Sequence, residues 1–311
     1  MAAEQEKNIE VLRGKDLRGK LVQFAWWMRQ EGYAEETIRG ASSCLNALIG
    51  RGADLADPIS VKDVLAKEQK WGENRRRNII NTYTVFLKWN GRTWEKPKCT
   101  VTRKFPFIPA EKEIDDLIAA SGKKNASFCQ LLKETAIRSG EAKKLMWTDL
   151  DFERKIVTLN EPEKGSNPRM WKVSAELIEM LNALPKKSER IFIGSLKSMR
   201  TTLHKTRKSL AHKLQNPRLL KITYHTFRHW KATMLYHQTK DIYYVAQFLG
   251  HKDIRNTMVY INIEHAIFGA SDNSEFTVRV VEKPEEIKAL LEVGFEYVLQ
   301  KDSLIFLRKR K

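Results

Sequence analysis

The sequence predicts a mainly α-helical protein with small β elements, an α+β fold of more than one domain. A chain of 311 residues is longer than one typical domain. Apolar residues recur at helical spacing through much of residues 16–92 and 110–270. Patterns of the β type are confined to short segments near residues 155–174 and to residues 275–311. We therefore expect a helical N-terminal domain, a larger mixed domain and a small C-terminal unit.

The N-terminal domain is expected to hold four helices. Residues 1–15 are polar and predict a flexible N-terminus. Within residues 16–92, the first helix begins near residue 16, and the others span residues 34–48, 61–67 and 74–89. The apolar spacing places the following side chains on the inner faces of three of these helices: Leu21, Phe24, Ala25 and Met28; Thr37, Ala41, Leu45 and Leu48; and Ile79, Ile80, Tyr83 and Phe86.

Residues 93–109 form the predicted interdomain linker. The stretch 91–110 holds three prolines and shows no helical period. A helix restarts at Glu111, so the second domain is expected to span residues 110–270. Such a linker would let two domains close around a large ligand.

Two segments with β character, residues 155–160 and 169–174, predict a hairpin in the second domain. Gly165, Asn167 and Pro168 mark the turn between them. The hairpin is the β element that we expect within the otherwise helical second domain.

The stretch 224–261 concentrates polar side chains on predicted helices. His225 and Arg228 are three residues apart, so they share a face of a helix. A glycine ends the next predicted helix, which places His251 at a fixed corner, and Tyr260 follows nine residues later. One anionic group could contact all four side chains.

This stretch resembles the C-terminal signature of the tyrosine recombinase, or phage integrase, family: H-x-x-R, then L-G-H, then a tyrosine nine residues after the second histidine. All of these positions match, as does an A-T-x-L run that begins at Ala232. Upstream, residues 134–152 resemble the family's first-arginine box, T-G-x-R-x-x-E-x-x-x-L-x-W-x-D, and supply Arg138 and Glu141. Ala136 stands where the family usually has glycine, and we expect a modest backbone adjustment there.

The resemblance implies a role for each matched residue. Tyr260 is the nucleophile and forms a phosphotyrosine link to DNA. Arg138 and Arg228 grip the non-bridging phosphate oxygens, because a guanidinium donates two parallel hydrogen bonds and stays charged. His225 and His251 hydrogen-bond the phosphate and help to move protons.

A lysine of the β-hairpin protonates the leaving 5′ oxygen in this family. Lys164, which precedes Gly165, is the closest match, and Lys172 is its competitor. Glu141 is predicted to hold its neighbours in place. We interpret His229 as a packing or supporting residue.

The resemblance further implies a fold and a function. Residues 16–92 would be a core-binding domain that clamps DNA, and residues 110–270 the catalytic domain with a three-stranded sheet. The predicted function is that of a site-specific recombinase or integrase, which acts through a 3′-phosphotyrosine intermediate without metal, cofactor or ATP, as a homotetramer on double-stranded DNA. Two alternatives stay open: a type IB topoisomerase-like strand transferase, and a non-catalytic DNA-binding protein with the same fold.

The charge of the chain agrees with a polyanionic partner. The formal net charge is +18, and residues 186–231 hold thirteen Lys and Arg against a single acid, Glu189. From the basic stretch and the start of the fourth helix we predict these DNA-binding residues: Arg75, Arg76, Arg77, Lys197, Arg200, Lys205, Arg207, Lys208, Lys213 and Lys221.

The remaining composition predicts a soluble, cytoplasmic protein without a membrane partner. Cys44, Cys99 and Cys129 lack metal-binding spacing, so we expect reduced, structural cysteines and no metal site. The first ten residues lack the apolar core of a signal peptide, and no apolar run reaches the length of a membrane span.

Residues 275–311 predict a β-α-β-β appendage outside the common core of the family, and they resemble tails of archaeal integrases. One hypothesis is that Ile263, Ile267 and Phe268, which precede it, dock onto a neighbouring protomer. The alternative is that the appendage packs on its own catalytic domain and adds stability.

Overall fold

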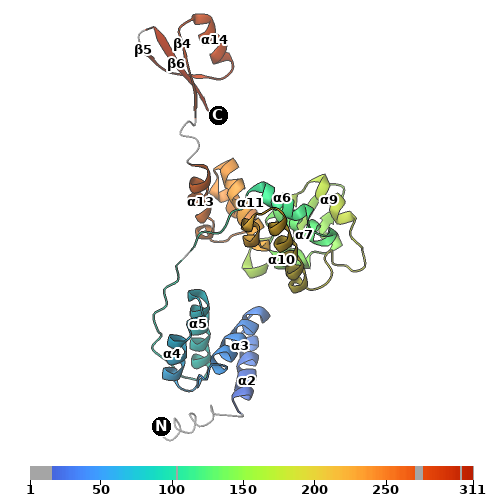
Figure 1. Cartoon of the computed structure of the whole chain (residues 1–311), viewed down its shortest axis with the longest axis vertical. Coiled ribbons are helices and arrows are strands. Elements are labelled where there is room, and N and C mark those ends of the chain that lie inside the picture. The colour runs from blue at the N-terminus through green and yellow to red at the C-terminus, as the bar shows by residue number, and fades with distance from the viewer. Residues whose placement is uncertain (1–15, 103, 270–275, 302, 311) are drawn as a thin grey trace. The chain divides into compact units, whose positions relative to one another are not determined.

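The computed structural model describes residues 16–102, 104–269, 276–301 and 303–310. The predicted flexible N-terminus, residues 1–15, lies outside the described residues, as does most of the segment before the C-terminal appendage. The chain divides into two compact units, residues 1–104 and 105–311 (Figure 1). Each unit is described separately below.

The described residues of the N-terminal unit form a bundle of four helices. These are α2 (Asp16–Gln30), α3 (Glu35–Ile49), α4 (Pro58–Lys67) and α5 (Glu73–Trp89). Asp57 caps α4 by accepting hydrogen bonds from two backbone N–H groups, and a proline follows it in the first turn. Helix α3 packs against both α2 and α5, and Figure 1 shows these helices in blue to teal.

The core of this bundle confirms most of the predicted inner positions. Phe24 and Phe86 meet edge to face with ring centroids 5.3 Å apart, and the Tyr83 hydroxyl donates to the Leu55 carbonyl at 3.1 Å. The prediction for Thr37 is wrong: Thr37 is exposed and Ile38 is buried in its place. One residue of rotation on a helix is 100°, so the apolar side chain takes the inner position and the threonine faces solvent.

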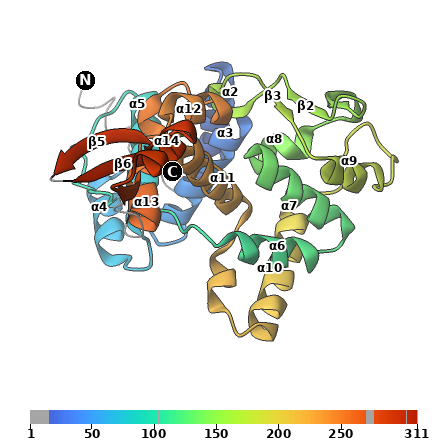
Figure 2. The same ribbon diagram turned by 90° about the horizontal axis from the view of Figure 1, so that it is seen from above.

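The second unit is organised around α7 (Lys123–Thr135), which packs against α6 (Glu111–Ala119), α9 (Ala175–Asn182) and α11 (Tyr224–Thr239). Figure 2 shows α7 beside α6 and α9. Phe128, Cys129 and Leu132 of α7 are fully buried, because this helix is surrounded by neighbours. The other helices of this part are α8 (Ser139–Lys144), α10 (Leu196–Lys213), α12 (Ile242–Leu249) and α13 (Val259–Phe268), with short 3₁₀ turns at η1 (Trp147–Asp149), η2 (Glu163–Gly165), η3 (Pro217–Lys221) and η4 (Ile254–Asn256).

A small antiparallel sheet confirms the predicted hairpin and the three-stranded sheet that the family resemblance implied. Its order is β1 (Leu150–Asp151), β2 (Ile156–Leu159) and β3 (Arg169–Lys172). Val157 pairs with Trp171, and both side chains are buried. Side chains alternate along β3, so Arg169 and Trp171 point inward while Met170 and Lys172 point outward.

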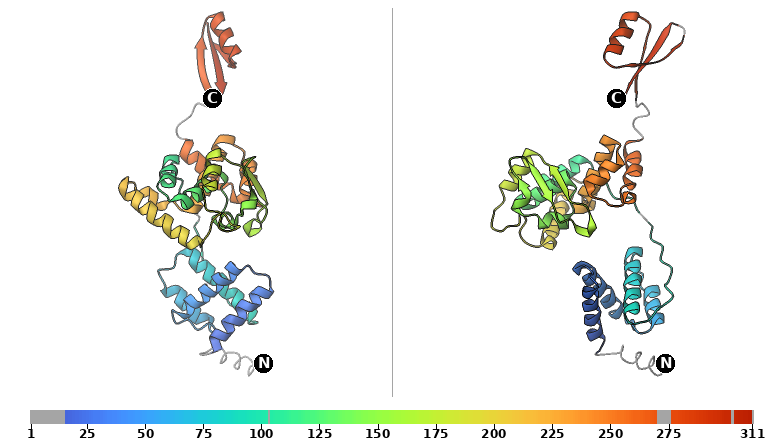
Figure 3. Two further views of the ribbon diagram at one scale, coloured as in Figure 1. Left: turned by 90° about the vertical axis from the view of Figure 1, so that its right-hand side faces the viewer. Right: turned by 180° about the vertical axis from the view of Figure 1, so that it is seen from behind.

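The C-terminal appendage has the predicted β-α-β-β order. Its elements are β4 (Phe276–Val281), α14 (Pro284–Glu292), β5 (Glu296–Lys301) and β6 (Leu304–Arg310), and the antiparallel sheet has the order β4-β6-β5. Helix α14 lies against one face of this sheet (Figure 3). Leu307, on the central strand, is fully buried.

The three cysteines are free thiols, as predicted. Among the residues that the structure describes, no helix combines the length and the apolar character needed to cross a bilayer.

Candidate active site

The site forms where the ends of α7 and α12 meet the side chain of Arg228 on α11. Arg228 is buried, and its Nη1 donates to the Ala136 carbonyl at 2.7 Å while its Nη2 donates to the Leu249 carbonyl at 2.7 Å. Both acceptors are backbone groups at or beside a helix C-terminus, where carbonyls lack a partner within the helix. Burial lowers the pKa of Arg228 to about 9, and the neighbouring charges of Arg138 and Arg169 act in the same direction.

Ala136 keeps the backbone conformation that glycine would favour. It ends α7 with φ 52° and ψ 19°, in the left-handed region. The modest backbone adjustment expected from the sequence at this position stays a prediction. The strain of a left-handed alanine is on the order of 1–2 kcal/mol, and the bond from Arg228 to its carbonyl helps to offset it.

Glu141 is a fully buried carboxylate that holds four donors. Its Oε1 accepts from Arg138 Nη1 at 2.9 Å and from the backbone N–H of Glu163 at 3.1 Å. Its Oε2 accepts from Arg169 Nη2 at 2.8 Å and from the backbone N–H of Arg138 at 3.0 Å. Burial alone would raise the pKa of Glu141, but these hydrogen bonds and the two guanidinium charges outweigh it and hold the pKa below its usual value. The predicted holding role of Glu141 agrees with this geometry.

Arg138 itself faces the hairpin. It precedes α8, and its Nη1 also donates to the Ser166 hydroxyl at 2.6 Å. Its Nη1 is therefore held by a carboxylate and by a hydroxyl, and the guanidinium keeps further N–H groups that could bind an anion.

Arg169 is a member of the site that the sequence analysis missed. It is buried on β3, and its Nη1 donates to the Leu249 carbonyl at 2.7 Å, so this carbonyl receives hydrogen bonds from two arginines. Gly250 follows with φ 70°, and a Cβ there would lie 2.7 Å from Arg169 Nε. Glycine is thus required at Gly250 for both its conformation and its close contact.

The hydrogen bonds of His251 define its tautomer. Its Nε2 lies 3.0 Å from Arg228 Nη2 and its Nδ1 lies 2.9 Å from the Thr257 hydroxyl. A guanidinium can only donate, so Nε2 is the acceptor and Nδ1 carries the proton. Burial lowers the pKa of His251 to about 4, helped by the charges of Arg228 and Arg138, so the ring is neutral at pH 7.

Tyr260 lies in the first turn of α13 and is 2% exposed. Its hydroxyl is 3.0 Å from Nδ1 of His229 on α11. Burial raises the pKa of Tyr260 to about 12 and lowers the pKa of His229 to about 4. We interpreted His229 from the sequence as packing or supporting; the structure places it in contact with the tyrosine hydroxyl.

Of the remaining predicted residues, His225 lies beside His229. It is exposed on the first turn of α11, and its ring meets that of His229 edge to face at 4.5 Å. The side chain of Lys164 lies outside what the structure describes, although its backbone belongs to η2. Lys172 points away from the face of β3 that carries Arg169, so it is a poor competitor for a role in this site.

Helix α13, which carries Tyr260, is bound to α11 within the same unit. Glu264 accepts from Lys240 at 2.5 Å and pairs with His237 at 2.8 Å. Ile263 is buried beside Tyr260, and the Phe268 ring stacks on His237 with centroids 3.8 Å apart. The predicted docking of Ile263 onto a neighbour is therefore wrong for this conformation, because its side chain is part of its own core.

The predicted DNA-binding residues differ in how their side chains are used. Arg76 donates to the carbonyls of Trp71 and Glu68, and Arg207 donates to the Ile222 carbonyl, so both stabilise their own unit. Arg75 is half-buried, with a bond to the Ser43 carbonyl at 3.2 Å. The others are exposed: Arg77, Lys197, Arg200, Lys205, Lys208, Lys213 and Lys221. Contact with DNA stays a prediction for the whole set.

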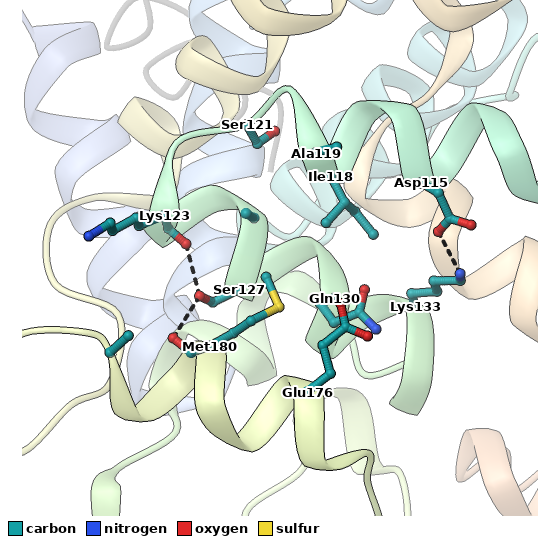
Figure 4. Close-up of a pocket in the computed structure, with 12 residues that line it drawn as sticks. Asp115, Ile118, Ala119, Ser121, Lys123, Ser127, Gln130, Lys133, Glu176 and Met180 are labelled. Carbon is teal, nitrogen blue, oxygen red and sulfur yellow. Dashed lines mark hydrogen bonds and ion pairs between the residues drawn. The ribbon is translucent and has the colours of Figure 1, made fainter.

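A pocket of about 700 Å³ lies between α6, α7 and α9, and it is separate from this site. Figure 4 shows Asp115 paired with Lys133 at one side of it and Ser127 bonded to the carbonyls of Lys123 and Met180 at the other. None of the candidate catalytic residues lines it. The structure, within its described residues, holds no group of three or more His, Cys, Asp or Glu side chains arranged for a metal ion.

The sequence of this chain matches a family model and is similar to named recombinases and integrases. The phage integrase family model matches residues 110–266. Tyrosine recombinase XerA of Pyrococcus furiosus is 22% identical over 264 residues, which cover 81% of this chain and 92% of that protein. The integrase of Shigella phage Sf6 is 31% identical over 191 residues, covering 52% of this chain and 48% of that protein.

Two solved structures share the fold. A lambda integrase dimer bound to a COC′ core site aligns with a TM-score of 0.61 and 15% identity, over 78% of this chain and 76% of that one. The Tn1549 transposon integrase in complex with transposon right-end DNA aligns with a TM-score of 0.60 and 15% identity, over 80% and 99%.

Proposed function

Because this chain belongs to the phage integrase family, we propose that it is a tyrosine-type site-specific recombinase whose nucleophile is Tyr260. It cleaves and rejoins duplex DNA through a 3′-phosphotyrosine intermediate. The link conserves the energy of the phosphodiester bond, so the reaction needs no ATP. Structural relatives that are bound to DNA, such as the lambda and Tn1549 integrases, support double-stranded DNA as the partner.

One observation carries the proposal: separate elements converge on a single buried tyrosine and a cluster of cations. Arg228 and His251 are hydrogen-bonded to each other, and Arg138 is joined to Arg169 through Glu141. A protein that only binds DNA has no need for a buried tyrosine beside guanidinium groups. A phosphoryl-transfer site needs both, because negative charge develops on the phosphate as the nucleophile attacks.

In this proposal Arg138 and Arg228 bind the non-bridging oxygens. A guanidinium has five N–H donors, and the bonds of Arg228 to Ala136, Leu249 and His251 leave donors for a phosphate. The two carbonyls fix the plane of the guanidinium before DNA arrives, so little conformational entropy is lost on binding.

The two histidines and Lys164 have the remaining roles in this proposal. His251 accepts a hydrogen bond from Arg228 and would hold this guanidinium in place for the phosphate. His225, which is exposed on the first turn of α11, would hydrogen-bond the phosphate. Lys164 would protonate the leaving 5′ oxygen. Its neighbour Ser166 contacts Arg138, which puts the hairpin backbone close to the phosphate-binding groups.

We further propose a division of labour along the chain. Residues 16–92 act as a core-binding domain that clamps DNA, residues 93–109 are the linker, and residues 110–270 are the catalytic domain. The exposed lysines of α10 would contact the phosphate backbone. The active assembly is a homotetramer on DNA, and residues 275–311 form an accessory appendage.

The proposal is tested by trapping and sequencing the covalent adduct. The protein is incubated with fragmented DNA that carries nicks, denatured in detergent, and the DNA attached to Tyr260 is sequenced. We expect one recurring sequence, and no adduct with Tyr260→Phe. Relaxation of supercoiled plasmid without partner sites would indicate a topoisomerase-like enzyme, and DNA binding without any adduct would indicate a non-catalytic protein.

A further inference from the structure

The nucleophile of this site is buried and must lose a proton. Tyr260 is 2% exposed, so bulk water does not reach its hydroxyl in this state. Burial raises the pKa of Tyr260 to about 12, which leaves the phenol protonated at neutral pH. A phenol attacks phosphorus well only if a base removes its proton during the attack.

His229 is the side chain that meets this hydroxyl. Its Nδ1 lies 3.0 Å from the Tyr260 oxygen, the usual distance for a hydrogen bond. The two residues are carried by α11 and α13, which pack against each other. His237, two turns further along α11, pairs with Glu264 of α13 and fixes the same helix contact.

Two other candidate bases, His251 and Glu141, have their polar atoms bound to other groups. His251 accepts from Arg228 through Nε2 and contacts Thr257 through Nδ1, so both of its ring nitrogens are used. His225 meets His229 ring to ring at 4.5 Å. Glu141, the buried carboxylate, is held by four donors from two arginines and two backbone groups.

The charge state of His229 suits a proton acceptor. Burial lowers its pKa to about 4, and the groups that face it, His225 and Arg228 on α11 and His251 after α12, lower it further. A neutral imidazole has one nitrogen with a free electron pair. When Nε2 carries the proton, Nδ1 accepts the hydrogen bond of the phenol.

We propose that His229 is a catalytic residue that accepts the proton of the Tyr260 hydroxyl through Nδ1. This inference rests on the proposed function of Tyr260. As the Tyr260 oxygen bonds to phosphorus, its O–H bond breaks and the proton moves to Nδ1; the bond from phosphorus to the 5′ oxygen breaks, and that oxygen takes a proton from a separate acid, which we assign to Lys164. In the rejoining step a 5′ hydroxyl attacks, the tyrosine oxygen leaves, and the imidazolium returns the proton to it.

Transfer must accompany the attack, because a free imidazole is a much weaker base than a phenolate. The pKa of a phenol falls as its oxygen bonds to phosphorus. The negative charge of the bound phosphate also favours the imidazolium. Both effects act only when DNA is in place, so the tyrosine stays unreactive in its absence.

The test compares His229→Asn with His229→Ala on the duplex recovered by trapping. An asparagine oxygen can take the place of Nδ1 as a hydrogen-bond acceptor, but it cannot accept the proton. His237→Asn is the matched control, because it makes the same change at the other contact between α11 and α13. DNA affinity and melting temperature are measured for each variant, to show that folding and binding persist.

Cleavage is measured on two duplexes, one ordinary and one with sulfur in place of the bridging 5′ oxygen. A thiolate leaves without being protonated, so the second duplex removes the need for an acid. We expect His229→Asn to cleave both duplexes about 100-fold or more slowly than wild type, in the range of general-base contributions. We expect Lys164→Ala to recover on the sulfur duplex and His237→Asn to cleave like wild type.

The dependence on pH gives a second readout on the sulfur duplex. Wild type should be flat from pH 6 to 9, because His229 is neutral throughout. His229→Asn should gain about tenfold in rate per pH unit, because Tyr260 must then ionise before it attacks.

Two results would overturn the inference: a His229→Asn rate within threefold of wild type while His229→Ala is slow, or a flat pH profile in the asparagine variant. Rescue by asparagine would show that the ring only positions the phenol. Failure of the proposed function would give a different result from failure of the His229 inference. In that case wild type would form no covalent adduct, or Tyr260→Phe would still form one.

Discussion

Replacing Glu141 by glutamine should destabilise the second unit and weaken catalysis together. The carboxylate is fully buried, and each of its oxygens accepts from two donors. A glutamine amide keeps one acceptor oxygen and turns the other into an NH₂ group. Whichever way it is oriented, the NH₂ faces two donors, so two hydrogen bonds are lost and Arg169 loses its buried counter-charge.

The expected loss follows from these contacts. Breaking a buried ion pair by removing the charge of one partner costs about 3–5 kcal/mol. For a domain of this size, 1 kcal/mol shifts the melting temperature by roughly 2–4 °C, so we expect a drop of roughly 6–20 °C. Arg138 loses the same carboxylate, so cleavage should fall even at a temperature where the variant is folded.

Thermal unfolding followed by circular dichroism measures the effect. The matched control is Glu163→Gln, which removes a neighbouring carboxylate that pairs with Lys144 at 2.8 Å near the surface. Exposed pairs contribute about 0–1 kcal/mol, so this control should melt close to wild type. Equal melting of the two variants would contradict the assignment of Glu141 as the central buried acceptor.

The pH dependence of the melting temperature tests whether the ionised form of Glu141 stabilises the fold. The pKa of Glu141 is lowered in the folded protein, so its contribution to stability is complete above the unfolded pKa of about 4.3 and is lost as the pH falls through the folded pKa. A protonated Glu141 has the shape and charge of glutamine. The difference between wild type and Glu141→Gln should therefore shrink below pH 4, and a difference that stays constant down to pH 3 would refute the reasoning.

Four further predictions concern DNA. Tyr260→Phe should bind DNA with wild-type affinity and form no covalent adduct in a detergent gel, because only the hydroxyl is removed and ring packing is kept. Arg228→Lys should cleave at least 100-fold more slowly in single-turnover assays, because one ammonium cannot reach the carbonyls of Ala136 and Leu249 together with a phosphate. Near-normal cleavage by this variant would show that Arg228 does not clamp the phosphate. EDTA should leave wild-type cleavage unchanged. Replacing Lys197, Lys205 and Lys208 by alanine should reduce the slope of log K against log salt by about 2–3 in binding assays, and an unchanged slope would remove α10 from the DNA interface.

Much of the fold was predictable because its signals are local. Helix periodicity and the turn at Gly165 identify the helices and the hairpin, since they depend on residues close in sequence. The error at Thr37 has the same origin. A helix face determined from spacing alone is uncertain by one residue when a small polar residue lies beside an apolar one.

The grouping of the predicted catalytic residues was predictable for a different reason. His225, Arg228, His251 and Tyr260 stand at fixed spacings within one stretch, and the spacing is set by two short helices and the corner at Gly250. A pattern of this kind is visible in one sequence, because the elements that position it are themselves local.

Arg169 and His229 were not predictable in the same way. Arg169 meets Glu141 and the Leu249 carbonyl, 28 and 80 residues away in the chain. A basic residue on a short strand gives no sign of such partners until the fold is known. His229 did carry a signal, its position next to Arg228, but a helix turns 100° per residue, so adjacent residues are expected on different faces. The structure uses both faces, because α11 packs against α12 and α13 as well as α7.

The distribution of charge would favour an anion in the proposed site even though most of its cations already have partners. Arg138, Arg169 and Arg228 lie close enough to influence one another, and burial together with the charges of Arg138 and Arg169 lowers the pKa of Arg228 to about 9. Glu141 is the buried carboxylate that pairs with two of these three cations. It fixes their positions while leaving a net positive potential, which strengthens as water is excluded. A phosphate that enters relieves this repulsion, and the extra negative charge of the transition state relieves it further, so the interaction is stronger in the transition state than in the bound substrate. The same repulsion disfavours an imidazolium at His229 until the phosphate is present, which couples activation of Tyr260 to the arrival of DNA.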